Sequence, residues 1–71
     1  MAVQVCAHIT GTVWKIEVSA GQAVESEQTL VILESMKMEM PVEAPQAGTV
    51  SRIAVSEGQA VDEGDLLVEL D

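Results

Sequence analysis

The chain has 71 residues and a formal net charge of −9, with twelve Asp and Glu residues against three Lys and Arg residues. This length lies near the lower limit at which one apolar core can stabilise a fold, so we expect a single domain over residues 1–71. The charge argues against nucleic acid and anionic membranes as partners, because both are bound through lysine and arginine. It would favour protein partners with basic docking surfaces, but it is explained equally well as a charge that keeps a small protein soluble.

The composition indicates an all-β protein. Hydrophobic residues make up 48% of the chain, and Trp14 is the only Trp, Tyr or Phe. The core must therefore consist of Val, Ile and Leu, which favour strands. No apolar run is long enough to span a membrane, and the N-terminus lacks a signal peptide, so we expect a cytoplasmic protein. Cys6 has no partner for a disulfide, which fits a reducing compartment, and we expect a buried, unreactive thiol.

The elements predicted along the chain are eight short strands. Apolar residues recur with a period of two, and Gly21 and Gly58 stand where tight turns need a positive φ. Pro41 and Pro45 suit an edge strand or a strand end. The expected strands cover residues 3–7, 12–18, 23–24, 29–35, 38–44, 49–55, 60–61 and 66–70.

An internal repeat organises these strands. A shift of 37 positions overlays residues 11–34 on residues 48–71 with 13 identities in 24 positions and no gap. Two copies of one supersecondary unit are implied, and neither copy could bury its apolar face alone. We therefore expect two quasi-symmetric four-stranded halves that close face to face into a flattened eight-stranded β-barrel or sandwich.

Lys37 lies at the junction between the two copies, in a run that carries three methionines. The strands before and after it are separated by almost nothing, which predicts a tight hairpin at the end of the body opposite the termini. Tight hairpins favour Asn and Gly because their central residues need positive φ. Met36, Lys37 and Met38 do not suit that conformation, and a broken local rule often marks a functional site.

The residues around this lysine resemble a known motif. Biotinyl domains carry Ala/Ser-Met-Lys-Met at their biotin-acceptor site, and this chain has Ser35-Met36-Lys37-Met38. The resemblance extends over the whole chain and includes the second half, with Gly48-Thr49-Val50, Gly58 and Gly64. The gapless repeat leaves no room for a protruding thumb, so the chain is similar to the compact, thumbless biotinyl domains of the biotin/lipoyl attachment family.

The resemblance implies the flattened β-barrel of these carriers and a biotin joined by an amide bond to Lys37. A biotin protein ligase would attach it, and Lys37 would then move carboxybiotin between a biotin carboxylase and a carboxyltransferase. The domain itself would be a non-catalytic carrier, monomeric when isolated, with no metal site. The residues expected to be recognised by the ligase and the other partners are Glu34, Ser35, Met36, Met38 and Glu39.

Charge and local differences qualify this picture. Glu34 and Glu39 favour the protonated amine, so we expect the ligase to supply both the activated biotin and the deprotonation.

The methionines could instead fill the end of the barrel, Met40 above all. Glu27 stands where the second copy has Gly64, which leaves the conformation of that turn open. The opening turns also differ, with residues 8–10 reading His-Ile-Thr and residues 45–47 reading Pro-Gln-Ala.

Two alternatives remain at the level of sequence. Lipoyl carriers of 2-oxo acid dehydrogenase-type complexes share the fold and present a lysine at the same turn, but they typically show Asp-Lys-Ala. The methionines beside Lys37 favour biotin. The other alternative is an interaction domain that carries no cofactor.

Overall fold

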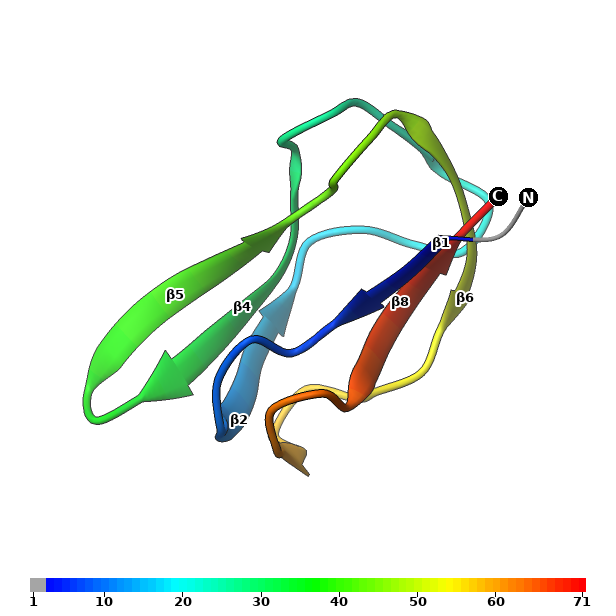
Figure 1. The fold of residues 1–71 in the computed structure, drawn as a ribbon. Coiled ribbons are helices and arrows are strands. Elements are labelled where there is room, and N and C mark those ends of the chain that lie inside the picture. Colours follow the sequence, from blue (N-terminus) through cyan, green and yellow to red (C-terminus); the bar gives the residue numbers. More distant parts are fainter. Residues whose placement is uncertain (1–2) are drawn as a thin grey trace.

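Eight short strands form two four-stranded antiparallel sheets that face each other (Figure 1). The computed structural model describes residues 3–71. The strand order is β1-β8-β6-β3 in one sheet and β5-β4-β2-β7 in the other. The strands are β1 (Val3–Cys6), β2 (Gly11–Ile16), β3 (Ala23–Val24), β4 (Thr29–Ser35), β5 (Met38–Glu43), β6 (Gly48–Ile53), β7 (Ala60–Val61) and β8 (Leu66–Leu70).

All eight predicted strands are confirmed, and their ends differ from the expected ones by two residues at most. Val18 and Val55 lie beyond the ends of β2 and β6, yet both are buried. The chain therefore leaves the hydrogen-bonded ladder at these points while still directing side chains into the core. Pro41 lies in β5, which is an edge strand, so its missing N–H interrupts no internal ladder.

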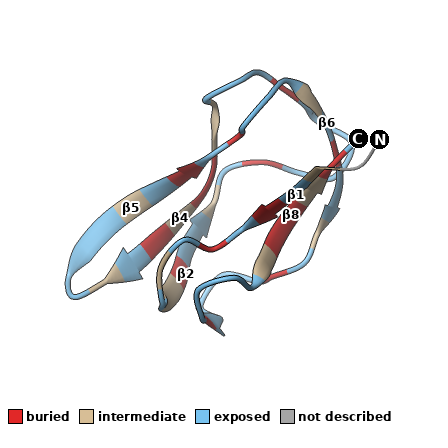
Figure 2. Cartoon of the chain, in the orientation of Figure 1, coloured by how far each residue is buried: buried red, intermediate tan, exposed pale blue. Residues whose placement is uncertain are grey.

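The core lies between the two sheets and is entirely aliphatic. Most strands bury every second residue, as a period of two requires, whereas β4 and β8 each bury one adjacent pair, Leu30–Val31 and Leu67–Val68. Figure 2 shows the buried positions along the facing strands. Within residues 3–71 no polar or charged residue is buried. The largest fully buried side chains are Leu30, Leu33, Leu67, Leu70, Val13, Val31, Val50 and Val68.

The internal repeat appears in the structure as a quasi-two-fold relation between the sheets. The 37-residue shift carries β1, β2, β3 and β4 onto β5, β6, β7 and β8, and so turns the order β1-β8-β6-β3 into β5-β4-β2-β7. Each sheet therefore takes two strands from each half of the sequence. β1 pairs with β8, β2 with β7 and β3 with β6, so the halves interlock and neither can complete its ladders alone.

The turns repeat with the strands. Gly21 and Gly58 have φ values of 90° and 89°, as the sequence predicts. The turn left open at Glu27 keeps the conformation of its glycine counterpart, with φ of 69° at Glu27 and 94° at Gly64. The Glu27 N–H donates to the Ala44 carbonyl at 2.8 Å, in the same way that the Gly64 N–H donates to the Ala7 carbonyl at 2.8 Å. This hydrogen bond fixes the backbone of Glu27 in the left-handed region.

The prediction of a buried thiol is wrong. Cys6 is exposed, whereas its neighbours Val5 and Ala7 are buried. A strand places successive side chains on opposite faces, so a cysteine between two inward residues must point outward.

Candidate functional site

The β4–β5 hairpin ends in the tightest possible turn. Ser35 pairs with Met38, so only Met36 and Lys37 connect the two strands. Both have positive φ, 53° at Met36 and 64° at Lys37, which is the pattern of a two-residue type I′ turn. This confirms the tight hairpin and the unfavourable conformation at Met36 and Lys37, whereas Met38 lies outside the turn, as the first residue of β5. For non-glycine residues the left-handed region costs about 1–2 kcal/mol each, so the turn is strained.

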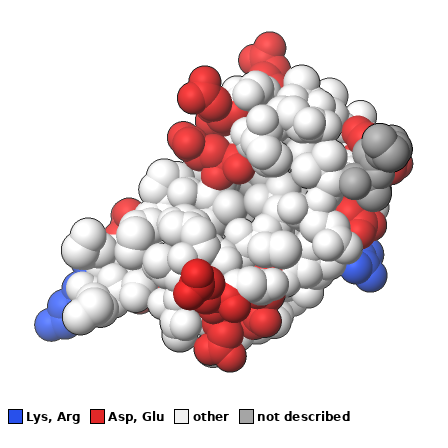
Figure 3. Space-filling model, viewed as in Figure 1, with Lys and Arg blue, Asp and Glu red and all other residues white. Residues whose placement is uncertain are grey.

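Lys37 is displayed at one extremity of the molecule. The molecule measures 33 × 17 × 17 Å along its principal axes. The hairpin tip forms one end, and the C-terminus and the start of β1 lie at the other end (Figure 1). A cationic group projects from the tip among uncharged atoms, as Figure 3 shows, and Lys37 is the exposed cation of this turn. The lysine can therefore reach a partner protein without hindrance from a segment attached at the termini.

The methionines beside the lysine are also exposed. Met36 is 92% exposed and Met38 is 60% exposed, while Met40, two residues farther along β5, is half-buried. Core filling therefore does not explain Met36 and Met38, although it accounts for part of Met40. Apolar side chains at the tip are available for contact with another molecule.

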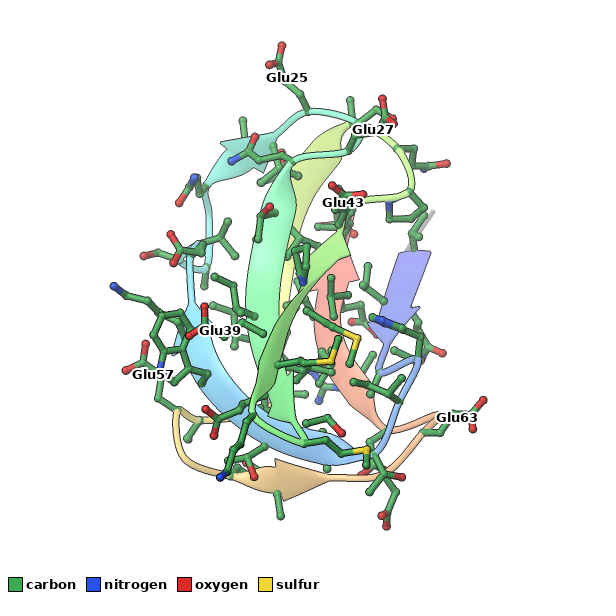
Figure 4. All side chains as sticks on the ribbon, turned by 90° about the vertical axis from the view of Figure 1, so that its left-hand side faces the viewer. Glu25, Glu27, Glu39, Glu43, Glu57 and Glu63 are labelled. Carbon is green, nitrogen blue, oxygen red and sulfur yellow. The ribbon has the colours of Figure 1, made fainter. Side chains whose placement is uncertain are left out.

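The remaining predicted site residues lie in the last two rungs of the hairpin. Glu34 pairs with Glu39 one rung before the Ser35–Met38 pair, and both glutamates are exposed (Figure 4 labels Glu39). Ser35 is half-buried. Like charges directly opposite each other in a ladder are destabilising. The folded state gains nothing from this acidic pair, which fits a role in recognition.

The base of the hairpin is fixed by the core. Leu33 and Val42 are buried, on β4 and β5 respectively. β4 is also paired with β2, and there Gly11 approaches the Glu34 carbonyl so closely that a Cβ on Gly11 would lie 2.6 Å from that oxygen. Gly11 thus positions the strand that carries the site. Sequence reasoning missed this role, although the Gly-Thr-Val of both copies was the available signal.

Other kinds of site have no support in the described part of the chain. Among residues 3–71, no three His, Cys, Asp or Glu side chains lie close enough to hold a metal ion. His8 is exposed in the bend after β1. The same residues include no helix that is long and apolar enough to cross a membrane.

Comparison with known sequences agrees with this geometry. The sequence profile of the Biotin_lipoyl family, described as "Biotin-requiring enzyme", matches residues 2–70. A biotin/lipoyl attachment protein of Bacillus subtilis (strain 168) is 46% identical over 62 residues, which make up 87% of this chain and 85% of that protein. The pyruvate carboxylase of Staphylococcus aureus is 38% identical over 65 residues, covering 92% of this chain but 6% of that enzyme.

Solved structures agree as well. The urea carboxylase of Kluyveromyces lactis superimposes with a TM-score of 0.94 and 34% identity over 100% of this chain and 6% of that one. A single-chain, multi-domain long-chain acyl-CoA carboxylase gives a TM-score of 0.91 and 34% identity, covering 96% of this chain and 7% of that one. The chain thus corresponds to a small part of these large enzymes, and by its profile match, its relatives and its fold it belongs to the biotin/lipoyl attachment family.

Proposed function

We propose that residues 1–71 form a single carrier domain, that biotin is attached to Lys37 through an amide bond, and that the domain serves a biotin-dependent carboxylase. The observation that carries this proposal is the place of Lys37, at the tip of a strained two-residue turn between exposed methionines. Relatives that are named carboxylases support biotin as the attached group.

The attachment needs a partner enzyme. Forming an amide between the Lys37 amine and the carboxyl group of biotin requires that carboxyl group to be activated first. A biotin protein ligase would supply an activated biotinyl-adenylate. The Lys37 Nζ, after losing a proton to the ligase or solvent, would attack its carbonyl carbon, and AMP would leave as the amide bond forms.

Lys37 would hold the biotin, and the bound group would supply the chemistry of carboxyl transfer between two active sites. The chain's own contribution is to hold and present the group. The exposed turn supplies reach, the β-sandwich supplies a rigid handle, and the covalent link raises the effective concentration of the group at both active sites. We place the acid–base chemistry in the two partners, a biotin carboxylase and a carboxyltransferase, and we expect the isolated domain to be monomeric.

The proposal is tested by incubating the purified domain with a biotin protein ligase, biotin and ATP, and measuring its intact mass. We expect one biotinyl group on the wild type and on Lys15→Arg, and none on Lys37→Arg. Both variants keep the charge, so a difference between them reports the position of the amine. An unmodified wild type at saturating biotin, or biotin on Lys15, would refute the proposal. A parallel reaction with a lipoate ligase and lipoic acid tests the lipoyl alternative.

A further inference from the structure

The outer faces of the two sheets are built on the same backbone. On the sheet that carries the hairpin, Ile32 pairs with Lys15 on one side and with Pro41 on the other. On the other sheet the residues 37 positions away make the same rung, with Glu69 paired to Arg52 and Gln4. Even the register shifts in β2 and β6 fall at equivalent places. The outer face of the other sheet can therefore be compared with that of the hairpin sheet, position by position, to see which residues folding requires there.

The side chains on the two faces differ in kind. The outer face of the hairpin sheet carries the apolar residues Trp14, Ile32 and Pro41, and Trp14 is 46% exposed. The equivalent residues of the other sheet are Ser51, Glu69 and Gln4, all polar. Because the same backbone folds with polar residues on one face, folding does not require the apolar residues on the other. An exposed tryptophan is also the residue type that most often anchors an interface.

The apolar strip on this outer face, which we define as Trp14, Ile32 and Pro41, lies beside an open groove. The groove has a volume of about 390 Å³ and is lined by Glu17, Gln28, Thr29 and Ile32. The groove is large enough to accept one side chain of a partner, and Glu17 contributes a carboxylate to its lining.

Charge on the same face is mostly negative. Glu34, Glu39 and Glu43 are exposed there, on the strands that also carry Ile32 and Pro41. The cation of this face, Lys15, lies with its Nζ 5.9 Å from the centre of the Trp14 ring, within the range of a cation–π contact. An apolar centre with an acidic surround complements a surface that presents an apolar side chain between lysines or arginines.

We propose that this face of the β5-β4-β2 layer is the docking surface for the enzyme that attaches biotin to Lys37. The inference rests on the proposed function. The face is continuous with the hairpin: Ile32 is three residues from Ser35, about 10 Å along the strand. A standard interface covers roughly 800 Å² on each partner, so an enzyme that encloses Lys37 reaches the apolar strip.

The attaching enzyme fits this surface better than the carboxylase subunits do. Before attachment, the Lys37 Nζ itself must reach the activated biotin, so the domain has to press closely against the ligase. After attachment, the added arm extends beyond Nζ, and the body of the domain can stay farther from the partner's active site. The need for close contact is therefore greatest in the attachment step.

The test exchanges the apolar strip for the chain's own polar counterparts. The variant Trp14→Ser, Ile32→Glu, Pro41→Gln copies Ser51, Glu69 and Gln4 onto the hairpin sheet. We expect kcat/KM for biotinylation by a purified biotin protein ligase to fall at least tenfold, mainly through a higher KM for the domain. Ile32→Glu adds a negative charge, which by itself should strengthen binding to a basic partner. A fall in kcat/KM would therefore be due to the loss of the apolar side chains and not to the change in charge.

Controls separate docking from folding and from the proposed function. Gln4→Ala, on the outer face of the other sheet, should leave kcat/KM unchanged, and thermal unfolding should show each variant folded. If the triple variant does not fold, the single exposed change Trp14→Ser replaces it, with an expected threefold or larger loss.

Unchanged kcat/KM in a folded variant would overturn the docking surface and leave the proposed function intact, whereas a wild type that takes up no biotin would overturn the function itself. Higher salt should raise the KM of the wild type, and a KM independent of salt would contradict a basic partner surface.

Discussion

The β4–β5 pair and the β8–β1 pair occupy equivalent places in the two sheets but differ in how they end. Leu33 faces Met40 in the first pair, and Leu70 faces Val3 in the second, in the same register. β4 and β5 continue for two more rungs and close in the Met36–Lys37 turn. In the second pair β1 is the first strand and β8 the last, so the two are not consecutive and no hairpin turn joins them.

This difference separates what the sheet needs from what the site needs. The β8–β1 pair forms without any connecting turn, so cross-strand packing is sufficient to hold an edge strand in place. The β4–β5 pair needs a connection, but the fold would accept Asn-Gly there at lower cost. Strain that packing does not require is typical of functional sites. The residues of the turn are therefore best explained by the presentation of Lys37.

The largest expected effect tests whether the two pairs contribute equally to the core. Leu33 is 0% exposed and Leu70 is 1% exposed. Leu33→Ala and Leu70→Ala should each lower the free energy of unfolding by about 2–5 kcal/mol, as measured by urea titration with far-UV circular dichroism. Costs within about 1 kcal/mol of each other would support equivalence. A much smaller cost at Leu70 would show that the open pair is less tightly packed than its counterpart.

The close approaches at the two glycines distinguish the pairs further. A Cβ on Gly11 would lie 2.6 Å from the Glu34 carbonyl oxygen, and one on Gly48 would lie 2.8 Å from that of Asp71. Gly11→Ala should destabilise the domain by about 1–3 kcal/mol, because Glu34 is fixed between β2 and β5. Gly48→Ala should cost less, because its Cβ would lie 2.8 and 3.6 Å from its two nearest atoms, against 2.6 and 3.3 Å at Gly11. Thermal unfolding measures both, and an equal or larger loss at Gly48 would contradict this reasoning.

Substitutions in the turns at Glu27 and Gly64 should have smaller effects on stability, of opposite sign at the two positions. Both residues have positive φ, and a Cβ on Gly64 would meet nothing within 4 Å. Gly64→Ala should therefore cost about 1 kcal/mol from backbone conformation alone. Glu27→Gly should stabilise the domain by up to about 1 kcal/mol, because it removes the cost of a positive φ at a non-glycine residue. The gain is limited because glycine raises the conformational entropy of the unfolded chain. Destabilisation by Glu27→Gly would mean that the side chain of Glu27 contributes to the fold.

The smallest effect on stability concerns the strained turn. Met36→Asn should raise the free energy of unfolding by about 0.5–1 kcal/mol, because asparagine adopts the left-handed region more readily. It should also lower kcat/KM for biotinylation if the ligase contacts Met36. Stability is measured by urea titration and biotinylation by initial rates. A variant that gains stability and keeps its full rate would show that Met36 is not recognised.

Sequence patterns predicted the strands and the place of the lysine because both depend on local rules. Alternation of apolar residues defines which residues form strands, and the 37-residue repeat placed Lys37 at the joint between the copies. The same alternation would have predicted the exposure of Cys6 correctly, since Val5 and Ala7 occupy the inner face. That error came from reading an apolar stretch without its period.

Other features depend on contacts between distant segments, which a local pattern does not encode. The conformation of Glu27 depends on a hydrogen bond to the Ala44 carbonyl, 17 positions away in the chain. A glycine is needed at position 11 because the Glu34 carbonyl, on a neighbouring strand, lies so close to it. The apolar strip of Trp14, Ile32 and Pro41 becomes one surface only when three strands pair.

The sequence by itself determined the strands, the repeat and a lysine displayed between methionines, since these follow from local conformation and periodicity. Only the tertiary structure decided that the halves exchange strands and that the turn residues are strained. It also decided which outer face is apolar. The physical reason is that pairing partners and register are selected by packing across the whole core, where each half supplies the hydrogen-bonding edges that the other lacks.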